Sequence, residues 1–319
     1  MTLRRVQAAA AAASLALSAA AGAHAECTLP AYAIPVAMFG REPRVDAKLD
    51  GIYAGMVLDS GASLSTIDPA IAEDRKLSGS QAAGAQPGPA AGSVTVVGVG
   101  GAVRAKLVTA HKFEMGGAEF ADVPFVATRY SGSAAGLIGQ NFLRRFDVEY
   151  DLANAVIRLT SPHGCAGFAL AYWTRPDEAY STLPLQVAPG VAGAVVWITV
   201  NGVKLRAELD TGSSASMLTL SAAAKVGVRP GDPGVEPSGR TVGIGPRVVR
   251  TWAASFAKVK IGDEEFKNAW LPIGDTALGD IDMLIGMDFF LTHRVYVSNL
   301  QRELYFTYNG GPVFDLPLR

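Results

Sequence analysis

The sequence predicts an all-β protein, mainly strands with a few short helices, in which one β-rich unit occurs twice. Gly and Pro, which favour turns over long helices, account for 35 and 18 of the 319 residues. Asp50-Gly51 and Asn201-Gly202 are strong hairpin-turn dipeptides, and each lies between two strand-like runs. These hairpins begin a longer repeat, which predicts two β lobes related by a pseudo-twofold axis.

The repeat can be followed through the chain by landmarks that recur in the same order. In each copy an Asp follows the turn Gly by eight residues, at Asp59 and Asp210, and the two Asp are 151 positions apart. The later landmarks pair Asp68 with Thr219, 97–100 with 242–245, Met115-Gly116 with Ile261-Gly262, and 136–142 with 283–289. The spacing drifts from 151 to 147 between the first and last landmarks, as a few loop deletions would cause.

Two short helices are expected at matching places in the two copies. Asp68 and Thr219 are residue types that cap helix N-termini well, and Pro69 suits the first helical position. The segments 78–93 and 228–240 diverge most between the copies, and the first is rich in Gly, Ala and Pro. Both segments are therefore expected to be exposed loops.

The first 25 residues are predicted to be a cleaved export signal. Two arginines precede an Ala-rich apolar run over residues 6–23, and Ala23-His24-Ala25 fits a small-x-small cleavage site. The alternative is a membrane anchor, but alanine is only weakly hydrophobic and such a run makes a poor membrane span. We therefore expect the protein in the periplasm. Only 33 residues separate Glu26 from Asp59, so no inhibitory propeptide is expected.

The rest of the chain is expected to form two lobes and a connection. Residues 26–165 make the N-terminal lobe, residues 185–319 the C-terminal lobe, and residues 166–184, which have no counterpart in the repeat, join them. Export would place Cys27 and Cys165 in an oxidising compartment, where they can form a disulfide. The alternative is two unpaired thiols.

Composition excludes several classes of function. The 28 basic and 29 acidic residues give a formal net charge of −1, without the basic surplus of a nucleic-acid-binding protein. The two Cys and four His (His24, His111, His163 and His293) lack the spacing of zinc ligands. We therefore expect no metal, no other cofactor and no nucleic-acid partner.

Three matched pairs of segments carry a resemblance to a known family. They are 59–63 (Asp-Ser-Gly-Ala-Ser) with 210–214 (Asp-Thr-Gly-Ser-Ser), the two Gly-rich segments near 98 and 243, and Leu137-Ile138-Gly139 with Leu284-Ile285-Gly286. Together they resemble the pepsin/retropepsin superfamily of aspartic proteases over residues 45–306. The resemblance implies two retropepsin-like β-barrel lobes with pseudo-twofold symmetry, arranged in one chain as in pepsin-like acid proteases.

Two carboxyl groups in contact can supply both the base and the acid that peptide hydrolysis needs. Like charges at close range do not both ionise easily, so the pair retains one proton, and one carboxyl is a base while the other is an acid. A pseudo-twofold repeat brings equivalent residues together at its axis. Asp59 and Asp210 are therefore the candidate catalytic residues.

The neighbours of the two Asp are expected to support them. Gly61 and Gly212 allow tight backbone turns and can donate N–H groups near the carboxyls. By resemblance, the Ser60 and Thr211 hydroxyls brace the opposite loop. The segments Leu137-Ile138-Gly139 and Leu284-Ile285-Gly286 are expected to pack behind these loops as structural residues.

One difference between the copies bears on acidity. Ala62 stands where the second copy has Ser213. A hydroxyl that donates to a carboxylate lowers its pKa, and the first Asp lacks such a donor if the geometry of the family holds. Without that donor on Asp59, activity is expected to peak nearer neutral pH than in strongly acidic relatives.

The Gly-rich segments are expected to be hairpin tips that act as flaps. The first holds Gly98, Val99, Gly100 and Gly101, and the second holds Gly243, Ile244 and Gly245. The backbone of such a flap can pair with an extended peptide substrate as an added strand. The alternative is that they are ordinary hairpin turns.

The sequence therefore predicts an aspartic endopeptidase that cleaves periplasmic or membrane-exposed polypeptides, by limited regulatory proteolysis rather than bulk digestion. A monomer is expected to suffice because one chain holds both Asp. One alternative is a non-catalytic peptide-binding module of the same fold. Another is a serine hydrolase that uses Ser60 with His111, which would leave the second copy unexplained.

Overall fold

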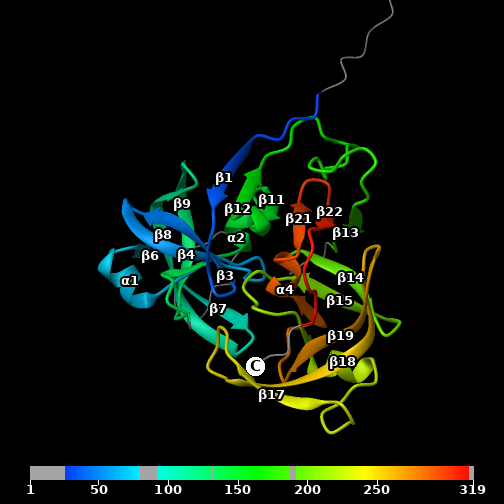
Figure 1. Ribbon diagram of the computed structural model, residues 1–319. Helices are drawn as coiled ribbons and strands as arrows, with labels where there is room; N and C mark the ends of the chain where they lie inside the picture. Colours follow the sequence, from blue (N-terminus) through cyan, green and yellow to red (C-terminus); the bar gives the residue numbers. More distant parts are fainter. Residues whose placement is uncertain (1–25, 80–91, 131, 187–191, 316–319) are drawn as a thin grey trace, which may run out of the picture.

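The computed structural model describes residues 26–79, 92–130, 132–186 and 192–315 (Figure 1). The expected export signal lies outside the described residues, as does most of the Gly/Ala/Pro-rich segment 78–93. The described chain is mainly strand, arranged in three sheets. The all-β prediction is confirmed.

The first sheet belongs entirely to the first copy of the repeat. Its strands are β2 (Ala37–Phe39), β3 (Glu42–Leu49), β4 (Ile52–Leu58), β5 (Thr66–Ile67), β6 (Ser78–Gly79), β7 (Ser93–Gly98), β8 (Gly101–Met115), β9 (Ala118–Ala127) and β10 (Gly136–Ile138). They follow the order β2-β3-β4-β10-β5-β9-β8-β6, and β7 pairs with β8. A further pairing of β3 with β8 curls the sheet back on itself, as a barrel-like lobe requires.

The second sheet repeats this arrangement in the second copy. Its strands are β14 (Val195–Val200), β15 (Val203–Leu209), β16 (Met217–Thr219), β17 (Glu236–Thr241), β18 (Val249–Ile261), β19 (Glu264–Gly274) and β20 (Met283–Ile285), in the order β14-β15-β20-β16-β19-β18-β17. The pairing of β14 with β18 corresponds to that of β3 with β8. In both lobes the strand before the repeated Asp pairs in parallel with a short later strand, β4 with β10 and β15 with β20.

The predicted turns and helix starts are confirmed. Asp50 and Asn201 both have φ of 49°, the left-handed conformation that a two-residue hairpin turn requires. Asp68 accepts a hydrogen bond from the Ala70 N–H at the start of α1 (Pro69–Asp74). Thr219 caps α3 (Leu220–Lys225) in the same way. The other helices are α2 (Gln140–Leu143), α4 (Met287–Phe290) and the 3-10 turn η1 (Leu152–Asn154).

A six-stranded sheet joins the two lobes. Its strands are β1 (Ala31–Pro35), β11 (Asp147–Asp151), β12 (Val156–Thr160), β13 (Ser181–Pro184), β21 (His293–Ser298) and β22 (Glu303–Tyr308), in the order β1-β12-β11-β21-β22-β13. The antiparallel pairing of β11 with β21 crosses from one half of the chain to the other (Figure 1). Strand β13 lies within the segment that the sequence predicted to be a connection.

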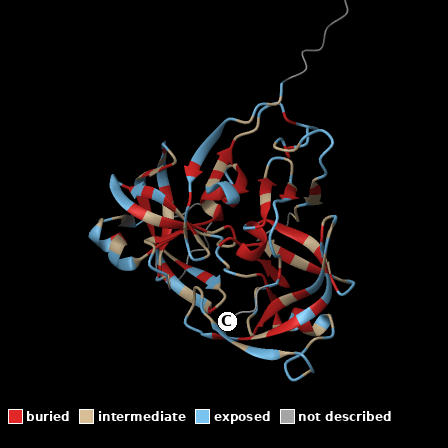
Figure 2. Cartoon of the chain, viewed as in Figure 1, coloured by how far each residue is buried: buried red, intermediate tan, exposed pale blue. Residues whose placement is uncertain are grey.

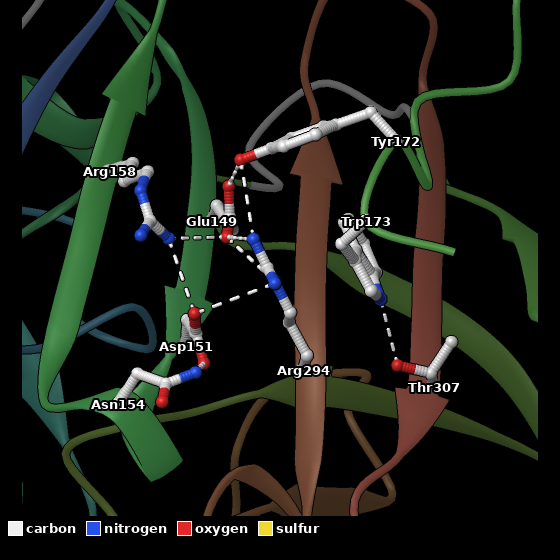
Figure 3. Close-up of polar contacts among 8 residues, drawn as sticks. All are labelled: Glu149, Asp151, Asn154, Arg158, Tyr172, Trp173, Arg294 and Thr307. Carbon is white, nitrogen blue, oxygen red and sulfur yellow. Dashed lines mark hydrogen bonds and ion pairs between the residues drawn. The ribbon is translucent and has the colours of Figure 1, made fainter. Parts of the chain in front are cut away.

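A cluster of charged side chains also links the two lobes, at the seam where β11 pairs with β21. The Glu149 carboxylate on β11 is fully buried and accepts hydrogen bonds from Arg158 at 2.7 Å and from Arg294 on β21 at 2.8 Å (Figure 3). The Tyr172 hydroxyl, from the connecting segment, donates to the same carboxylate. Trp173 donates to Thr307 on β22 at 2.9 Å, which fixes this segment against the second lobe.

Buried apolar side chains continue through both lobes and the joining sheet (Figure 2). They include Phe113 and Phe142 in the first lobe and Phe289 and Phe306 in the second. Cys27 and Cys165 form a disulfide, which ties the start of the described chain to the residue just before the connecting segment. No helix among the described residues is both long enough and apolar enough to cross a membrane.

One sequence-based expectation about loops was wrong in part. Residues 236–241, most of which fall in the segment expected to be an exposed loop, form strand β17 and pair with β18. The strand lies at the edge of its sheet and buries almost nothing. It therefore needs no alternation of apolar residues, and Pro237 and Gly239 beside its register shift disguise it further.

Candidate active site

The two candidate catalytic residues lie at equivalent places, just beyond the ends of β4 and β15. The backbone N–H of Asp59 donates to the Ile138 carbonyl at 3.0 Å. The backbone N–H of Asp210 donates to the Ile285 carbonyl at 2.8 Å. The short parallel strands β10 and β20 thus hold both Asp in position, as the matched sequence segments led us to expect.

The loops that follow the two Asp hold each other across the lobe boundary. The Ser60 hydroxyl donates to the Leu209 carbonyl at 2.8 Å, and the Thr211 hydroxyl donates to the Leu58 carbonyl at 2.7 Å. Each hydroxyl also accepts the backbone N–H of the other residue at 3.0 Å. These four buried hydrogen bonds give Ser60 and Thr211 the bracing role that the resemblance implied.

The two carboxyl groups meet at this junction. The side chains of Asp59 and Asp210 are hydrogen-bonded to each other. Each also lies against the glycine of the opposite loop. A Cβ on Gly61 would lie 2.4 Å from the Asp210 carboxyl carbon, and one on Gly212 would lie 2.4 Å from that of Asp59. Only glycine leaves room for this contact.

Burial raises the pKa of both carboxyls, but not equally. Asp59 accepts backbone N–H groups from Gly61 at 3.1 Å and from Ala62 at 2.9 Å, and these favour its ionised form. Asp210 accepts only the Gly212 N–H, at 2.8 Å, among backbone donors of the described chain. Its pKa is raised well above the usual range by burial, then by the charge of Asp59. The second backbone donor therefore favours the ionised form on Asp59 over that on Asp210.

This order reverses the asymmetry that the sequence led us to expect. The Ser213 hydroxyl donates to the Ala215 carbonyl at 2.8 Å, not to the Asp210 carboxyl. The backbone of the first loop supplies the extra donor instead, since the Ala62 N–H reaches Asp59. The Ser213 backbone N–H bonds to the Asp210 carbonyl, 3.2 Å away. Loop backbone orientation, which the residue types did not reveal, decides which Asp is more acidic.

The segments predicted to pack behind the loops do so unevenly. Ile138 and Ile285 are fully buried in the main core. A Cβ on Gly139 would lie 2.6 Å from the Ala62 carbonyl oxygen, and one on Gly286 2.5 Å from the Ala215 carbonyl carbon, so both glycines lie directly against the catalytic loops. Leu137 and Leu284 are also buried, but they lie outside that core.

Sequence reasoning missed a second layer of support. The Ser65 hydroxyl donates to the Asn141 side chain at 2.8 Å, and the Ser216 hydroxyl donates to the Asp288 carboxyl at 2.7 Å. The two serines are 151 positions apart, and Asn141 and Asp288 are 147 apart, as in the repeat. Extending the comparison to polar residues beside the landmarks would have found them. A further missed contact is Arg41, which donates to the Ser214 carbonyl of the other lobe at 2.8 Å.

The two Gly-rich segments form hairpin tips that touch each other. Val99 and Gly100 form the tip between β7 and β8, and residues 242–248 link β17 to β18. The Gly100 N–H donates to the Ile244 carbonyl at 2.9 Å, and the Arg247 N–H donates to the Gly100 carbonyl at 2.9 Å. The Thr276 hydroxyl donates to the Val99 carbonyl at 2.9 Å. Figure 1 shows the two hairpins approaching from opposite lobes.

The remaining flap residues make this close contact possible. Gly101 and Gly245 have φ of 103° and 114°, which favour glycine. A Cβ on Gly98 would lie 2.6 Å from the Ile244 carbonyl oxygen, and one on Gly243 would lie 3.1 Å from the Val99 Cβ. The structure thus brings together all the residues that the sequence assigned to the two flaps.

The serine-hydrolase alternative finds no support in these contacts. The Ser60 hydroxyl lies buried at the lobe boundary and bonds to backbone groups of Leu209 and Thr211. His111 lies on β8, where its ring pairs with Asp122 at 2.8 Å on an exposed surface. Nor does any group of three or more His, Cys, Asp or Glu side chains in the described ranges form a candidate metal site.

A two-lobed β fold with a buried carboxyl pair at its seam defines the class of bilobal aspartic protease folds. The family model for aspartyl proteases matches the chain twice, at residues 45–142 and 196–289. Together the matches span more than half of the sequence, and each contains one Asp of the pair. The chain therefore belongs to the aspartyl protease family. A search of curated proteins found no match.

Proposed function

We propose that this protein is an aspartic endopeptidase that hydrolyses peptide bonds with Asp59 and Asp210. The observation that carries the proposal is the pair of buried, hydrogen-bonded carboxyls, one from each lobe, with unequal access to N–H donors. This inequality assigns a base and an acid before substrate binds. Peptide hydrolysis requires both.

Hydrolysis then follows from the protonation states. The Asp59 carboxylate takes a proton from water as the water oxygen attacks the peptide carbonyl carbon, and Asp210 gives its proton to the carbonyl oxygen. The product is a neutral tetrahedral diol, with Asp59 protonated and Asp210 ionised. In the second step Asp59 protonates the amide nitrogen, Asp210 removes a diol proton, and the C–N bond breaks. One water is consumed and both carboxyls return to their starting states.

The flaps supply the substrate-binding surface in this proposal. A peptide bound as an extended strand can form backbone hydrogen bonds with the hairpin tips. The tips must first separate, which breaks the contacts that Gly100 makes with Ile244 and Arg247 and that Val99 makes with Thr276. Access therefore depends on an opening step, which suits selective cleavage of flexible segments better than bulk digestion.

We place this activity in the periplasm, on polypeptides that include exposed parts of membrane proteins. The support is the export signal expected from the sequence and the Cys27–Cys165 disulfide, which suits an oxidising compartment. One chain supplies both carboxyls, so the monomer is the proposed active form.

The test uses the chain from Glu26 onward and an unfolded protein as substrate. We expect internal cleavage that pepstatin inhibits and a serine-directed inhibitor leaves unchanged. Binding of the unfolded protein without cleavage would favour the peptide-binding alternative. The natural substrates can then be sought by comparing new protein N-termini in cells that carry the wild-type protein or Asp59→Asn. An unchanged set of N-termini would contradict regulatory proteolysis.

A further inference from the structure

A third carboxyl lies beside the pair, on the strand that leads to Asp210. Along β15, Leu205, Ala207 and Leu209 are fully buried in the core, and alternation turns Glu208 to the opposite face of the sheet. Glu208 lies two residues before Asp210. Its side chain is partly buried but keeps contact with solvent.

The repeat relates Glu208 to Val57 in the first lobe. The two are 151 positions apart, the same spacing as the two Asp. Val57 is 1% exposed yet lies outside the core that contains Met56 and Leu58 on the same strand, so it too faces away from that core. Beside them in the sheets, Val57 pairs with Leu137, and Glu208 pairs with Leu284. Val57 and Glu208 thus occupy equivalent positions two residues before the repeated Asp, and only Glu208 can carry a charge.

The backbone around Glu208 is built to accommodate its carboxyl. A Cβ on Gly193, just before β14, would lie 2.0 Å from Glu208 Oε1. Any other residue at position 193 would displace the carboxyl. The charge of Asp59, from the other lobe, acts on Glu208, and the charge of Glu208 acts on Asp210. Glu208 is therefore near enough to the catalytic pair for its charge to interact with both Asp.

The Glu208 carboxyl lacks a directly compensating group within the described part of the chain. Among the residues that the structure describes, none donates a hydrogen bond to Glu208 or forms an ion pair with it. Arg206, which attracts it through space, has its guanidinium paired with Asp280. Burial and the charge of Asp59 raise the pKa of Glu208 to about 7. A partly buried carboxyl without a partner favours binding of a cation.

We propose that Glu208 determines specificity by binding a Lys or Arg side chain of the substrate residue next to the scissile bond. This inference rests on the proposed function, because it takes the Asp59–Asp210 pair as the place where the peptide lies. The cation neutralises the carboxylate and forms a charge-assisted hydrogen bond.

The test measures binding of two inhibitors rather than turnover. They are hydroxyethylene peptides, which cannot be cleaved, and they differ only in Lys or norleucine beside the isostere. We expect the wild-type protein to bind the Lys peptide at least about tenfold more tightly, since a charged partner is gained at similar size. Glu208→Gln keeps the shape of the side chain and should bring the two affinities to within about twofold.

Glu73→Gln is the matched control, because Glu73 is exposed on α1 and receives the same chemical change. It should keep the wild-type preference for Lys. Equal affinity of the wild-type protein for both peptides, or an undiminished preference in Glu208→Gln, would overturn the proposal. Cleavage of an unfolded protein is measured separately. If cleavage fails while the Lys preference depends on Glu208, the specificity proposal stands and the endopeptidase proposal falls.

Discussion

Asp59 accepts hydrogen bonds from two backbone N–H groups, whereas Asp210 accepts one from the backbone of the described chain and bonds to the Asp59 carboxyl. This difference favours ionisation of Asp59 over Asp210. It arises from the loop backbones, although the two loops are copies of one motif. The pair is therefore asymmetric in chemistry while the lobes remain nearly symmetric in structure.

The asymmetry predicts a bell-shaped dependence of kcat/KM on pH. Asp59 must be ionised, so activity rises as pH increases through its pKa, which burial raises above the usual carboxyl range. Asp210 must be protonated, so activity falls as pH passes its pKa, which is raised further. Ser213→Ala should shift neither limb, because its hydroxyl bonds to Ala215. A shift of either limb in that variant would show that the Ser213 hydroxyl acts on the Asp210 carboxyl after all, as the sequence suggested.

Thr211→Val should weaken the junction between the catalytic loops. The change removes the hydroxyl that donates to Leu58 and accepts from Ser60, and leaves both backbone groups buried without that partner. We expect a loss of about 1–3 kcal/mol in the free energy of unfolding, together with a lower kcat. Urea denaturation and peptide kinetics measure the two effects. Thr211→Ser retains the hydroxyl and should restore most of both; equal losses in the two variants would argue against the hydrogen bonds.

Thr276→Val should loosen the contact between the flap tips. The Thr276 hydroxyl holds the Val99 carbonyl, next to the residue whose N–H and carbonyl bond to the other tip. Hydrogen exchange at the Gly100 and Arg247 amides should become faster in the variant, because these amides exchange when the tips separate. Thr276→Ser should exchange at the wild-type rate. If Thr276→Val leaves both rates unchanged, this hydroxyl does not hold the flaps together.

Glu149→Gln tests the charged cluster at the lobe seam (Figure 3). The variant would remove one of the two carboxylates that Arg158 and Arg294 share and leave them with Asp151 alone, so we expect a loss of about 1–3 kcal/mol in unfolding free energy. Glu265→Gln is a suitable comparison, because it breaks a more exposed pair with Lys258, which solvent screens, and should cost much less. Similar losses in the two variants would show that the cluster does not secure the seam.

The preference for Lys should depend on pH. Glu208 has a pKa of about 7 in the free protein, raised by burial and by the charge of Asp59, while the nearby Arg206 opposes the shift. Below that pH its carboxyl is protonated and cannot pair with a cation. The ratio of affinities for the Lys and norleucine peptides should therefore be largest above pH 7 and fall as the pH is lowered. A ratio that is constant across this range would contradict the assignment.

Most of what could be predicted from the sequence followed from the internal repeat. Turn dipeptides, helix caps and the two Asp recur at fixed spacing, and local preferences of this kind depend little on distant contacts. Strand β17 was missed because an exposed edge strand needs no apolar pattern. The expectation that Ser213 donates to its Asp was wrong, because loop backbone geometry directs its hydroxyl to Ala215 and the Ala62 N–H to Asp59. Glu208 was missed because its neighbours in space, Gly193 and Asp59, are distant in the sequence.

The most direct test of the central claim is a double-mutant comparison of the catalytic pair. Peptide hydrolysis is measured for the wild-type protein, Asp59→Asn, Asp210→Asn and the double variant at the pH of maximum activity. If the two carboxyls act as one unit, each single variant should lose at least about a thousandfold in kcat, and the double variant should lose no more. Substantial activity in either single variant, or losses that multiply in the double variant, would contradict a shared-proton mechanism.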